Sequence, residues 1–407
     1  MKTDLQNIEY IFPNEFHLKD FAKIQTEEPF SENAINFLDA LANILRNDPR
    51  SKEFPEITTF AFFCRRSNLI QLKKDHSPES GTRKGRGIAF HVSPSNVPMN
   101  FAYSLASGIL AGNLNILRLP SKKFKQVEIV CEAIKILSKK PELKYFARRM
   151  LLVRYDKLNF ATAYFSSICD ARIIWGGDAA VNEIKKITLP DKSIDVIFSD
   201  KYSICIINAD KFVHTPFQSK LAEAFYNDTF LFDQNACTSP HLVAWFGNDK
   251  NVAESKEIFW GSLHKIVKER YYFQSQSAID KLAAFYEQAI HLDEVKKTPT
   301  PDNLVWRTEL NQLSEEIDKY RCNCGYFVEC KITSLIELSE IIFKKPQAIA
   351  CYGISDEDWG QFFPQKRTEI IDRIKPIGKT SEFSLNWDGH DLIDELSVPI
   401  EFNNKTG

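Results

Sequence analysis

The stretch that decides the fold spans residues 85–124 and reads GRGIAFHVSPSNVPMNFAYSLASGILAGNLNILRLPSKKF. Its short apolar run, residues 87–92, is typical of a buried strand. A loop stiffened by two prolines follows, and a helix rich in small residues is predicted over residues 100–111. A second strand is predicted over residues 115–119. Strand, helix and strand in this order indicate a mostly parallel sheet with helices packed on it, an α/β fold.

The rest of the chain continues this alternation. Before the stretch, apolar residues at helical spacing predict a helix over residues 31–45 with Ser31 as its N-cap, and the first thirty residues look irregular. After it, residues 171–175 read as a strand that ends at Gly176-Gly177 before another helix. Further strands and helices fill the last half, and a domain boundary is expected near Tyr202.

Composition and charge exclude several classes of protein. The 407 residues carry a formal net charge of −2 with both signs interspersed, so neither a nucleic-acid partner nor a polybasic membrane surface is expected. The N-terminus lacks the apolar core of a secretory signal, and no run approaches the roughly 18–20 apolar residues of a membrane span. A cytoplasmic location and reduced thiols are therefore expected for the nine cysteines.

One cysteine stands out from the others. Cys237 lies in a polar loop, QNACTSP, whereas Cys131 and Cys205 lie in apolar runs that suit buried structural thiols. A nucleophilic thiolate needs amide donors and partial exposure, which the neighbours of Cys237 could supply. The alternative is that Cys237 is structural, as most single cysteines are.

Three other cysteines are close together in the sequence but do not predict a metal site. Cys322 and Cys324 are one residue apart and Cys330 follows alone. Structural zinc sites show C-x2-C pairs or added histidines. We therefore expect no metal at this segment.

Polar residues follow the predicted strands of the first half. Asn96, in the rigid loop PSNVP, could donate to an oxyanion, or it could cap the helix that starts at Asn100. Arg118 near the end of the second strand, with Ser121 and Lys122 just after it, suits a ribose and a phosphate, although a solvated basic turn is at least as common.

Two glycines complete the candidate residues of the first half. Gly176 and Gly177 would let a phosphate approach the start of the next helix. By itself, a Gly-Gly pair before a helix is weak evidence. The segment Gly85-Arg86-Gly87 precedes its strand and lacks a third glycine, so it is not the dinucleotide-binding fingerprint.

Together these passages resemble the LuxC-type long-chain acyl-CoA reductases, a branch of the aldehyde dehydrogenase superfamily, from about Ser31 to Ser397. Several long motifs in the right order carry the resemblance. They are the stretch 85–124, IIWGGDAAVNEIKK (173–186), FSDKYSICII (198–207), FYNDTFLFDQNACTSPH (225–241) and RIKPIGKTSEFSLNWDGHDLI (373–393).

The resemblance implies an aldehyde-dehydrogenase-like α/β fold. It assigns residues 1–30 to an N-terminal arm, 31–201 to an NADP-binding Rossmann-like domain, 202–390 to a catalytic domain and 391–407 to a C-terminal tail. Cys237 corresponds to the nucleophile of the family, and Asn96 to the oxyanion asparagine of the superfamily motif P-W-N-F-P. The residues expected to bind the cofactor are Ser93, Pro94, Ser95, Arg118, Ser121, Lys122, Gly176 and Gly177.

Two motifs of the superfamily are changed in this sequence. The glutamate that activates water in hydrolytic members, in E-L-G-G, is missing from FSDKYS, where Phe198 stands near its place and Asp200 is a possible substitute. The E-x-F-G-P motif seen in relatives gives way to RCNCGYF, residues 321–327, which leaves the contact to the nicotinamide ribose open. Loss of the water-activating base favours reduction over hydrolysis.

The resemblance implies that NADPH reduces an acyl group on Cys237 to the fatty aldehyde. Lys122 supports NADPH, because a lysine attracts the 2′-phosphate that a glutamate would repel. The implied partners are a long-chain acyl thioester, an acyl carrier protein or acyl-protein synthetase, and further copies of the chain in a homo-oligomer. Luminescence and surface-polysaccharide pathways both remain open. The alternatives are an oxidative dehydrogenase, an acyltransferase or thioesterase that uses Cys237 alone, and a non-catalytic acyl-binding subunit.

Overall fold

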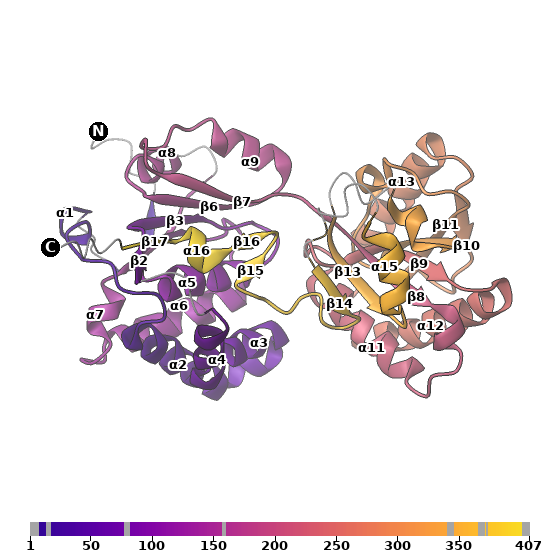
Figure 1. The fold of residues 1–407 in the computed structure, drawn as a ribbon, viewed down its shortest axis with the longest axis horizontal. Helices are drawn as coiled ribbons and strands as arrows, with labels where there is room; N and C mark the ends of the chain where they lie inside the picture. The colour runs from indigo at the N-terminus through magenta and orange to yellow at the C-terminus, as the bar shows by residue number, and fades with distance from the viewer. Residues whose placement is uncertain are drawn as a thin grey trace, which may run out of the picture. The chain divides into compact units, whose positions relative to one another are not determined.

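The computed structural model describes residues 8–13, 18–76, 82–156, 160–339, 346–364, 371 and 373–400. The chain divides into two compact units (Figure 1). Unit 1 comprises Met1–Ser199 and Phe383–Gly407, and unit 2 comprises Asp200–Glu382. The first boundary lies two residues before the one expected at 201/202. Residues 383–390, which we expected in the catalytic domain, belong to unit 1.

The sheet of unit 1 has the strand order β1-β5-β4-β3-β6-β7. Its strands are parallel except β1, which runs antiparallel to β5. Part of the predicted irregular arm therefore forms an edge strand of the sheet, β1. The bounds are β1 Glu9–Phe12, β3 Ile88–Val92, β4 Leu114–Arg118, β5 Met150–Arg154, β6 Ala171–Trp175 and β7 Ile194–Phe198.

Helices cover both faces of this sheet (Figure 1). The first long one, α2, buries seven apolar side chains, and the Oγ of its N-cap Ser31 accepts the Ala34 N–H, so the predicted cap is confirmed. The Phe-rich segment that follows forms two helices, α3 and α4, which are separated by Cys64 and Arg65. The bounds are α1 Leu18–Phe21, α2 Glu32–Asn47, α3 Pro55–Phe63, α4 Arg66–Asp75, α5 Asn100–Leu110, α6 Lys125–Ser138, α7 Lys144–Ala147, α8 Ala161–Ser166 and α9 Asp178–Lys185, with η1 at Pro49–Glu53.

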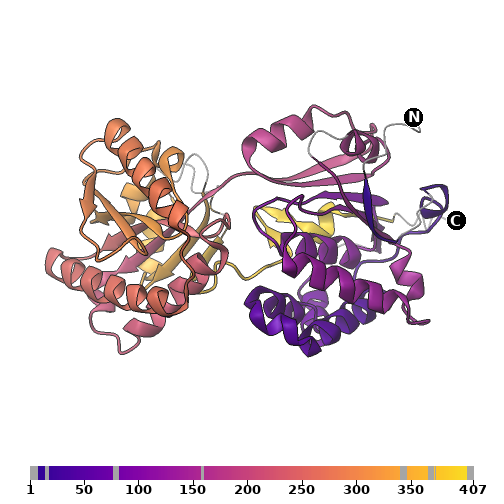
Figure 2. The same cartoon turned by 180° about the vertical axis from the view of Figure 1, so that it is seen from behind.

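The C-terminal segment returns to unit 1 (Figure 2, yellow). Strand β17, Ser397–Pro399, pairs antiparallel with β2, Arg83–Gly85. The Arg83 Nε atom donates to Ser397 Oγ at 2.8 Å. This long-range pairing explains why the segment is not a separate tail. Between unit 2 and β17 lie β15 Asn386–Trp387, β16 His390–Asp391 and α16 Leu392–Glu395.

Unit 2 is built on a second sheet with the order β10-β11-β12-β9-β8-β13-β14. Its strands are parallel except β10, which is antiparallel to β11. The strands are β8 Tyr202–Asn208, β9 Pro240–Phe246, β10 Lys296–Thr298, β11 Trp306–Leu310, β12 Tyr326–Ile332, β13 Pro346–Tyr352 and β14 Arg373–Pro376. The helices are α10 Ala209–Phe212, α11 Gln218–Thr229, α12 Asp249–Arg270, α13 Ser275–His291 and α15 Asp356–Phe362, with η2 Phe230–Phe232, η3 Ile317–Tyr320 and η4 Leu335–Leu338.

Within the described ranges, no helix has the length and apolar character needed to cross a membrane.

Candidate active site

Cys237 lies in the loop between η2 and β9 of unit 2 and is partly exposed. Asp233 and Gln234, which open the loop, adopt left-handed backbone angles with φ of 50° and 59°. These angles turn the chain sharply before the cysteine. At its other side, Ser203 Oγ of β8 donates to the Cys237 carbonyl at 2.7 Å. The thiol is therefore carried on a backbone that is held at both ends.

The side chain of Gln234 holds the cysteine loop against the start of β12. It is buried, its Nε2 donates to the carbonyls of Pro240 (2.9 Å) and Tyr326 (3.0 Å), and its Oε1 accepts the N–H groups of Gly325 (3.0 Å) and Tyr326 (3.1 Å). All the polar atoms of this side chain are thus bonded. The sequence showed Gln234 only as a polar neighbour of Cys237 and did not indicate this role.

The segment RCNCGYF, which precedes and enters β12, lies beside the cysteine loop. The Asn323 Nδ2 donates to Asn235 Oδ1 at 2.7 Å, and the Cys324 N–H donates to the Asp233 carbonyl at 3.0 Å. The changed motif is therefore hydrogen-bonded to the loop that carries the candidate nucleophile. Residues far apart in sequence form this arrangement, so spacing alone could not reveal it.

Burial distinguishes several of the other thiols. Cys131 and Cys205 are fully buried, and burial raises the pKa of Cys131 to about 12 and the pKa of Cys205 well above its ordinary value. Burial also raises the pKa of the partly exposed Cys322 to about 11. A thiol held protonated in this way is a poor nucleophile. The predicted structural character of Cys131 and Cys205 agrees with this burial.

Asp200, the possible replacement for the missing glutamate, forms an ion pair. The Arg321 Nη2 lies 2.5 Å from both carboxylate oxygens of Asp200. The carboxylate of Asp200 is therefore engaged by a guanidinium. Phe198, which stands near the place of that glutamate in the sequence, lies in unit 1, where its ring stacks on Trp175 with 3.8 Å between centroids.

In unit 1, Asn96 lies exposed in the bend between β3 and α5. Helix α5 begins at Asn100 after Met99, and no side chain caps it. Within the described residues, the Asn96 amide makes no side-chain hydrogen bond. The alternative reading of Asn96 as the cap of this helix is therefore wrong, and its amide is free to bind a ligand.

Ser93, Pro94 and Ser95 follow β3 directly. The Ser93 N–H donates to the Arg118 carbonyl at 3.3 Å, which ties the end of β3 to the end of β4. The Ser93 side chain is buried, and its Oγ has no hydrogen-bond partner among the described residues. A buried hydroxyl without a partner at the carboxyl end of parallel strands suits contact with a ligand. Pro94 is half-buried and Ser95 is exposed.

Arg118, Ser121 and Lys122 do not share one environment. Arg118 is buried, with its guanidinium 4.9 Å from the Tyr155 ring centroid, and burial lowers its pKa. Ser121 and Lys122 are exposed beyond β4. The Lys122 Nζ lies 5.1 Å from the Phe124 ring centroid. Of the three, Ser121 and Lys122 are accessible to a nucleotide.

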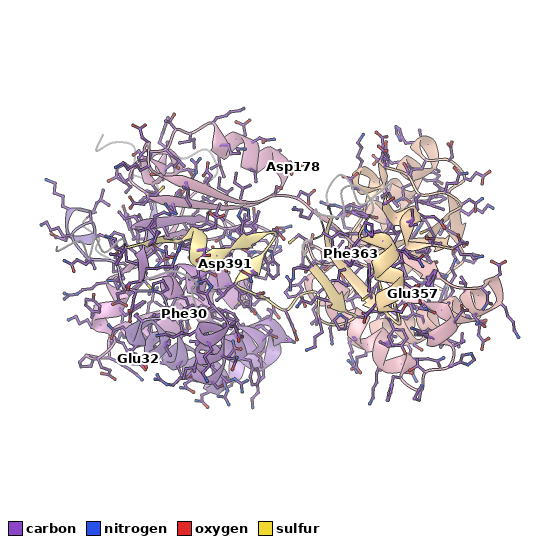
Figure 3. All side chains as sticks on the ribbon, viewed as in Figure 1. Phe30, Glu32, Asp178, Glu357, Phe363 and Asp391 are labelled. Atoms are coloured by element: carbon purple, nitrogen blue, oxygen red, sulfur yellow. The ribbon has the colours of Figure 1, made fainter. Side chains whose placement is uncertain are left out.

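Gly176 and Gly177 lie between β6 and the start of α9. A Cβ added at Gly177 would meet no atom within 4 Å, and one at Gly176 would meet Ala180 Cβ at an ordinary 3.6 Å. Packing among the described residues therefore does not require either glycine, and the helix start is open. Asp178 in the first turn (Figure 3) places a carboxylate there, which opposes a bound phosphate.

A buried series of hydrogen-bonded side chains links β6, α5, β3 and β4 of unit 1. The Trp175 Nε1 donates to Ser104 Oγ at 3.0 Å, Ser104 Oγ bonds His91 Nδ1 at 2.7 Å, and His91 Nε2 lies 3.1 Å from Asn115 Oδ1. Burial lowers the pKa of His91 to about 4, so the ring is neutral at pH 7. The only signal of this hydrogen-bonded series in the sequence was one histidine within an apolar strand.

Comparison with known proteins identifies relatives. The profile of the family described as acyl-CoA reductase (LuxC) matches residues 6–397. A search of curated protein sequences finds no match.

Solved structures of aldehyde dehydrogenases share the fold. Aldehyde dehydrogenase 21 from Physcomitrella patens is 12% identical with a TM-score of 0.66, covering 93% of this chain and 86% of that one. An NAD-dependent benzaldehyde dehydrogenase from Corynebacterium glutamicum is 14% identical with a TM-score of 0.61 and the same coverage. Proline utilization A from Bdellovibrio bacteriovorus is 13% identical with a TM-score of 0.62, covering 94% of this chain. The chain spans only 44% of the length of that protein.

Proposed function

Because this chain belongs to the LuxC family of acyl-CoA reductases, we propose that it reduces an activated fatty acyl group to the aldehyde, with NADPH as reductant and Cys237 as nucleophile. The observation that carries the proposal is the partly exposed thiol on a loop held by Gln234 and Ser203. The fold shared with aldehyde dehydrogenases fits this chemistry, since an aldehyde dehydrogenase also interconverts the aldehyde and carboxyl oxidation levels.

The chemistry at Cys237 proceeds in two stages. The thiolate attacks the carbonyl carbon of the acyl thioester, a carbon–sulfur bond forms, and the donor thiol leaves with a proton. Hydride addition to the resulting acyl-enzyme gives a thiohemiacetal, whose collapse releases the aldehyde and regenerates the thiolate. The net reaction consumes one thioester, one NADPH and one proton, and yields aldehyde, thiol and NADP⁺.

We propose that the side-chain amide of Asn96 donates a hydrogen bond to the developing oxyanion. The assignment rests on the PSNVP motif and on the exposed amide, which does not cap α5. An amide that donates to the oxyanion contributes about 2.7–4 kcal/mol to stabilisation of the transition state in comparable enzymes.

Residues of unit 1 fit a bound NADPH, which supplies the hydride. The Ser93 hydroxyl is buried without a partner in the described part of the chain, and Ser121 and Lys122 are exposed beyond the neighbouring strand. Lys122 would attract the 2′-phosphate. Gly176 and Gly177 leave the start of α9 open to a phosphate.

The pairing of Asp200 with Arg321 supports reduction rather than hydrolysis of the acyl-enzyme. A water molecule needs a general base before it can attack an acyl-enzyme. In this chain the carboxylate closest to the expected place of that base is Asp200, and it is engaged by the guanidinium of Arg321. Acyl carrier protein or an acyl-protein synthetase as donor, a homo-oligomeric state and a cytoplasmic location remain predictions from the resemblance.

The direct test supplies hexadecanoyl-CoA and NADPH to the purified chain. Loss of nicotinamide absorbance together with trapped aldehyde is expected for the wild type. Cys237→Ala should abolish both, because the acyl-enzyme cannot form. The matched control is Cys322→Ala, which removes a partly exposed thiol from the adjacent segment and should retain activity.

The rival functions give different results in the same assay. An acyltransferase or thioesterase would acylate Cys237 and turn over without NADPH. An oxidative enzyme would convert aldehyde and NADP⁺ to acid. A non-catalytic subunit would show no rise in melting temperature with NADPH, because a ligand that binds only the native state must stabilise it. No acylation of Cys237 by any thioester would contradict its assignment.

A further inference from the structure

Helix α13 of unit 2 has its polar and apolar faces reversed relative to an ordinary surface helix. Its buried side chains are Lys281, Ala284 and Gln288. The opposite side carries four large apolar residues that are 43–76% exposed, and we call this set the outer face of α13. The outer face consists of Ile279, Leu282, Tyr286 and Ile290. Successive spacings of three, four and four residues align these side chains in one stripe along the helix.

Specific hydrogen bonds fix this orientation. The Lys281 Nζ donates to the carbonyls of Asn303 (2.7 Å) and Leu304 (3.1 Å). The Gln288 Nε2 donates to the Tyr320 carbonyl at 2.8 Å, and its Oε1 accepts the Tyr326 hydroxyl at 2.8 Å. Rotating the helix by half a turn would bury the stripe, but the carbonyls and the hydroxyl that Lys281 and Gln288 bond would lose their partners, at a cost of roughly 1–3 kcal/mol for each group left buried. The exposed stripe is therefore imposed by the fold.

The reversed arrangement carries a cost on both sides of the helix. Burial lowers the pKa of Lys281 to about 8, so the inner face holds a desolvated cation. The outer face leaves four large apolar side chains in water along a single helix. Contiguous exposed apolar side chains with a polar border are typical of interaction sites.

Charge on the border of the stripe indicates what covers it. Asp280 and Glu287 are exposed and lie seven residues apart, on the same flank of the outer face. The opposite flank carries Ala278, Phe285 and Ala289 and no charge. Among the residues of α13, the border is therefore acidic along one side only.

We propose that the outer face of α13 docks in an apolar groove of another protein, and that lysine or arginine residues of that protein line the groove edge beside Asp280 and Glu287. Anchors at this spacing are those of a helix bound in a groove. The helix of 17 residues is about 25 Å long and offers all four anchors to one partner. This surface is distinct from the cysteine loop and does not depend on the reaction proposed above.

Two other occupants fit less well. In an antiparallel pair of α13 helices from two copies of the chain, twofold symmetry would place the acidic flanks against each other, and like charges repel. A helix that binds a membrane surface carries lysine and arginine beside its apolar face. Here the border is acidic, and the only lysine of α13 is buried.

The test uses two designed helical hairpins labelled with fluorescein. Both present the same leucine-lined groove, but one has lysine and the other glutamate along the groove edges. Fluorescence anisotropy with the full chain should give at least tenfold tighter binding of the lysine hairpin, because only that hairpin complements Asp280 and Glu287. Added salt should reduce this difference.

Three variants complete the test. Leu282→Asp combined with Tyr286→Asp should weaken binding of the lysine hairpin at least tenfold. Asp280→Lys combined with Glu287→Lys should reverse the preference between the hairpins. Ile136→Asp on α6, a similar change at a half-exposed apolar residue, should leave binding unchanged. Far-ultraviolet circular dichroism checks that each variant is folded.

Several results would overturn the proposal. Equal binding of both hairpins, or binding unaffected by the Leu282 and Tyr286 changes, would remove the role of the outer face. Light scattering that finds a wild-type oligomer dissociated by those changes would assign the face to a second copy. Cosedimentation with phosphatidylcholine and phosphatidylglycerol vesicles, lost in the same variant, would assign it to a membrane.

Discussion

Gln234 bonds both backbone groups of Tyr326. Its Nε2 donates to the Tyr326 carbonyl at 3.0 Å, and its Oε1 accepts the Tyr326 N–H at 3.1 Å. A primary amide is the side-chain group that can serve a neighbouring peptide N–H and C=O at once. The pairing joins the loop of Cys237 to β12 and sets the position of the candidate nucleophile within unit 2.

Replacing Gln234 should therefore impair both stability and activity. Gln234→Ala leaves buried backbone groups without partners, so the free energy of unfolding should fall by about 2–4 kcal/mol, and kcat should fall at least tenfold. Chemical denaturation and the NADPH assay measure the two effects. Gln276→Ala, at an exposed position of α13, should change stability by less than about 0.5 kcal/mol. Unchanged stability of Gln234→Ala would show that the pairing contributes little.

Asn96→Ala should affect catalysis without affecting folding. The side chain is exposed and does not cap α5, so the melting temperature should stay the same. Loss of one oxyanion donor should lower kcat about 10²–10³-fold while KM changes little. Steady-state kinetics separate the two parameters. A large rise in KM with normal kcat would instead indicate that Asn96 only positions the substrate.

Lys122→Glu should change the preference between cofactors. The carboxylate would repel the 2′-phosphate, so KM for NADPH should rise roughly tenfold or more while KM for NADH changes little. Measuring kcat/KM with both nucleotides gives the ratio. Lys123→Glu, a charge reversal at the adjacent exposed lysine, is the matched control. Equal losses in the two variants would indicate a general effect of charge rather than a contact of Lys122.

The buried ring of His241 should make unit 2 sensitive to acid. Burial, with a smaller contribution from the Arg321 cation, lowers the pKa of His241 to about 3, whereas the unfolded chain has the ordinary value of 6.5. Below pH 6.5 the unfolded state therefore binds more protons than the folded state. Above pH 6.5 protonation of this residue does not reduce the free energy of unfolding. As pH falls below 6.5, the free energy of unfolding decreases by about 1.4 kcal/mol per pH unit down to about pH 3.

His241→Phe should reduce this loss of stability at low pH. The ring can still stack on Tyr202, whose centroid lies 5.7 Å from that of His241, but it cannot take up a proton. Denaturation of the variant and the wild type between pH 4 and pH 7 gives the difference in slope. Tyr202→Phe, which keeps the imidazole, should retain the slope of the wild type. Parallel curves for His241→Phe and the wild type would exclude His241 as the source.

Much of unit 1 could be predicted because its signals are local. Ser31 caps α2 as its position before an amphipathic run indicated, and the strand at 171–175 has the predicted bounds. The strand β5, Met150–Arg154, was missed in the sequence, although it is fully buried between its neighbours. A short apolar run at that length does not distinguish a strand from a helix until its partners are known.

The sequence by itself determined the family, the alternation of strands and helices, and the choice of Cys237 as a candidate over the cysteines in apolar runs, because each rests on motifs that are continuous stretches of the chain. Only the tertiary structure decided that residues 383–399 return to unit 1, that Gln234 bonds Tyr326, and that α13 turns its apolar side outward. Each of these depends on hydrogen bonds between residues separated by many positions. The polar groups of Lys281 and Gln288 found partners in the interior of unit 2, and that pairing outweighed the burial of an apolar stripe.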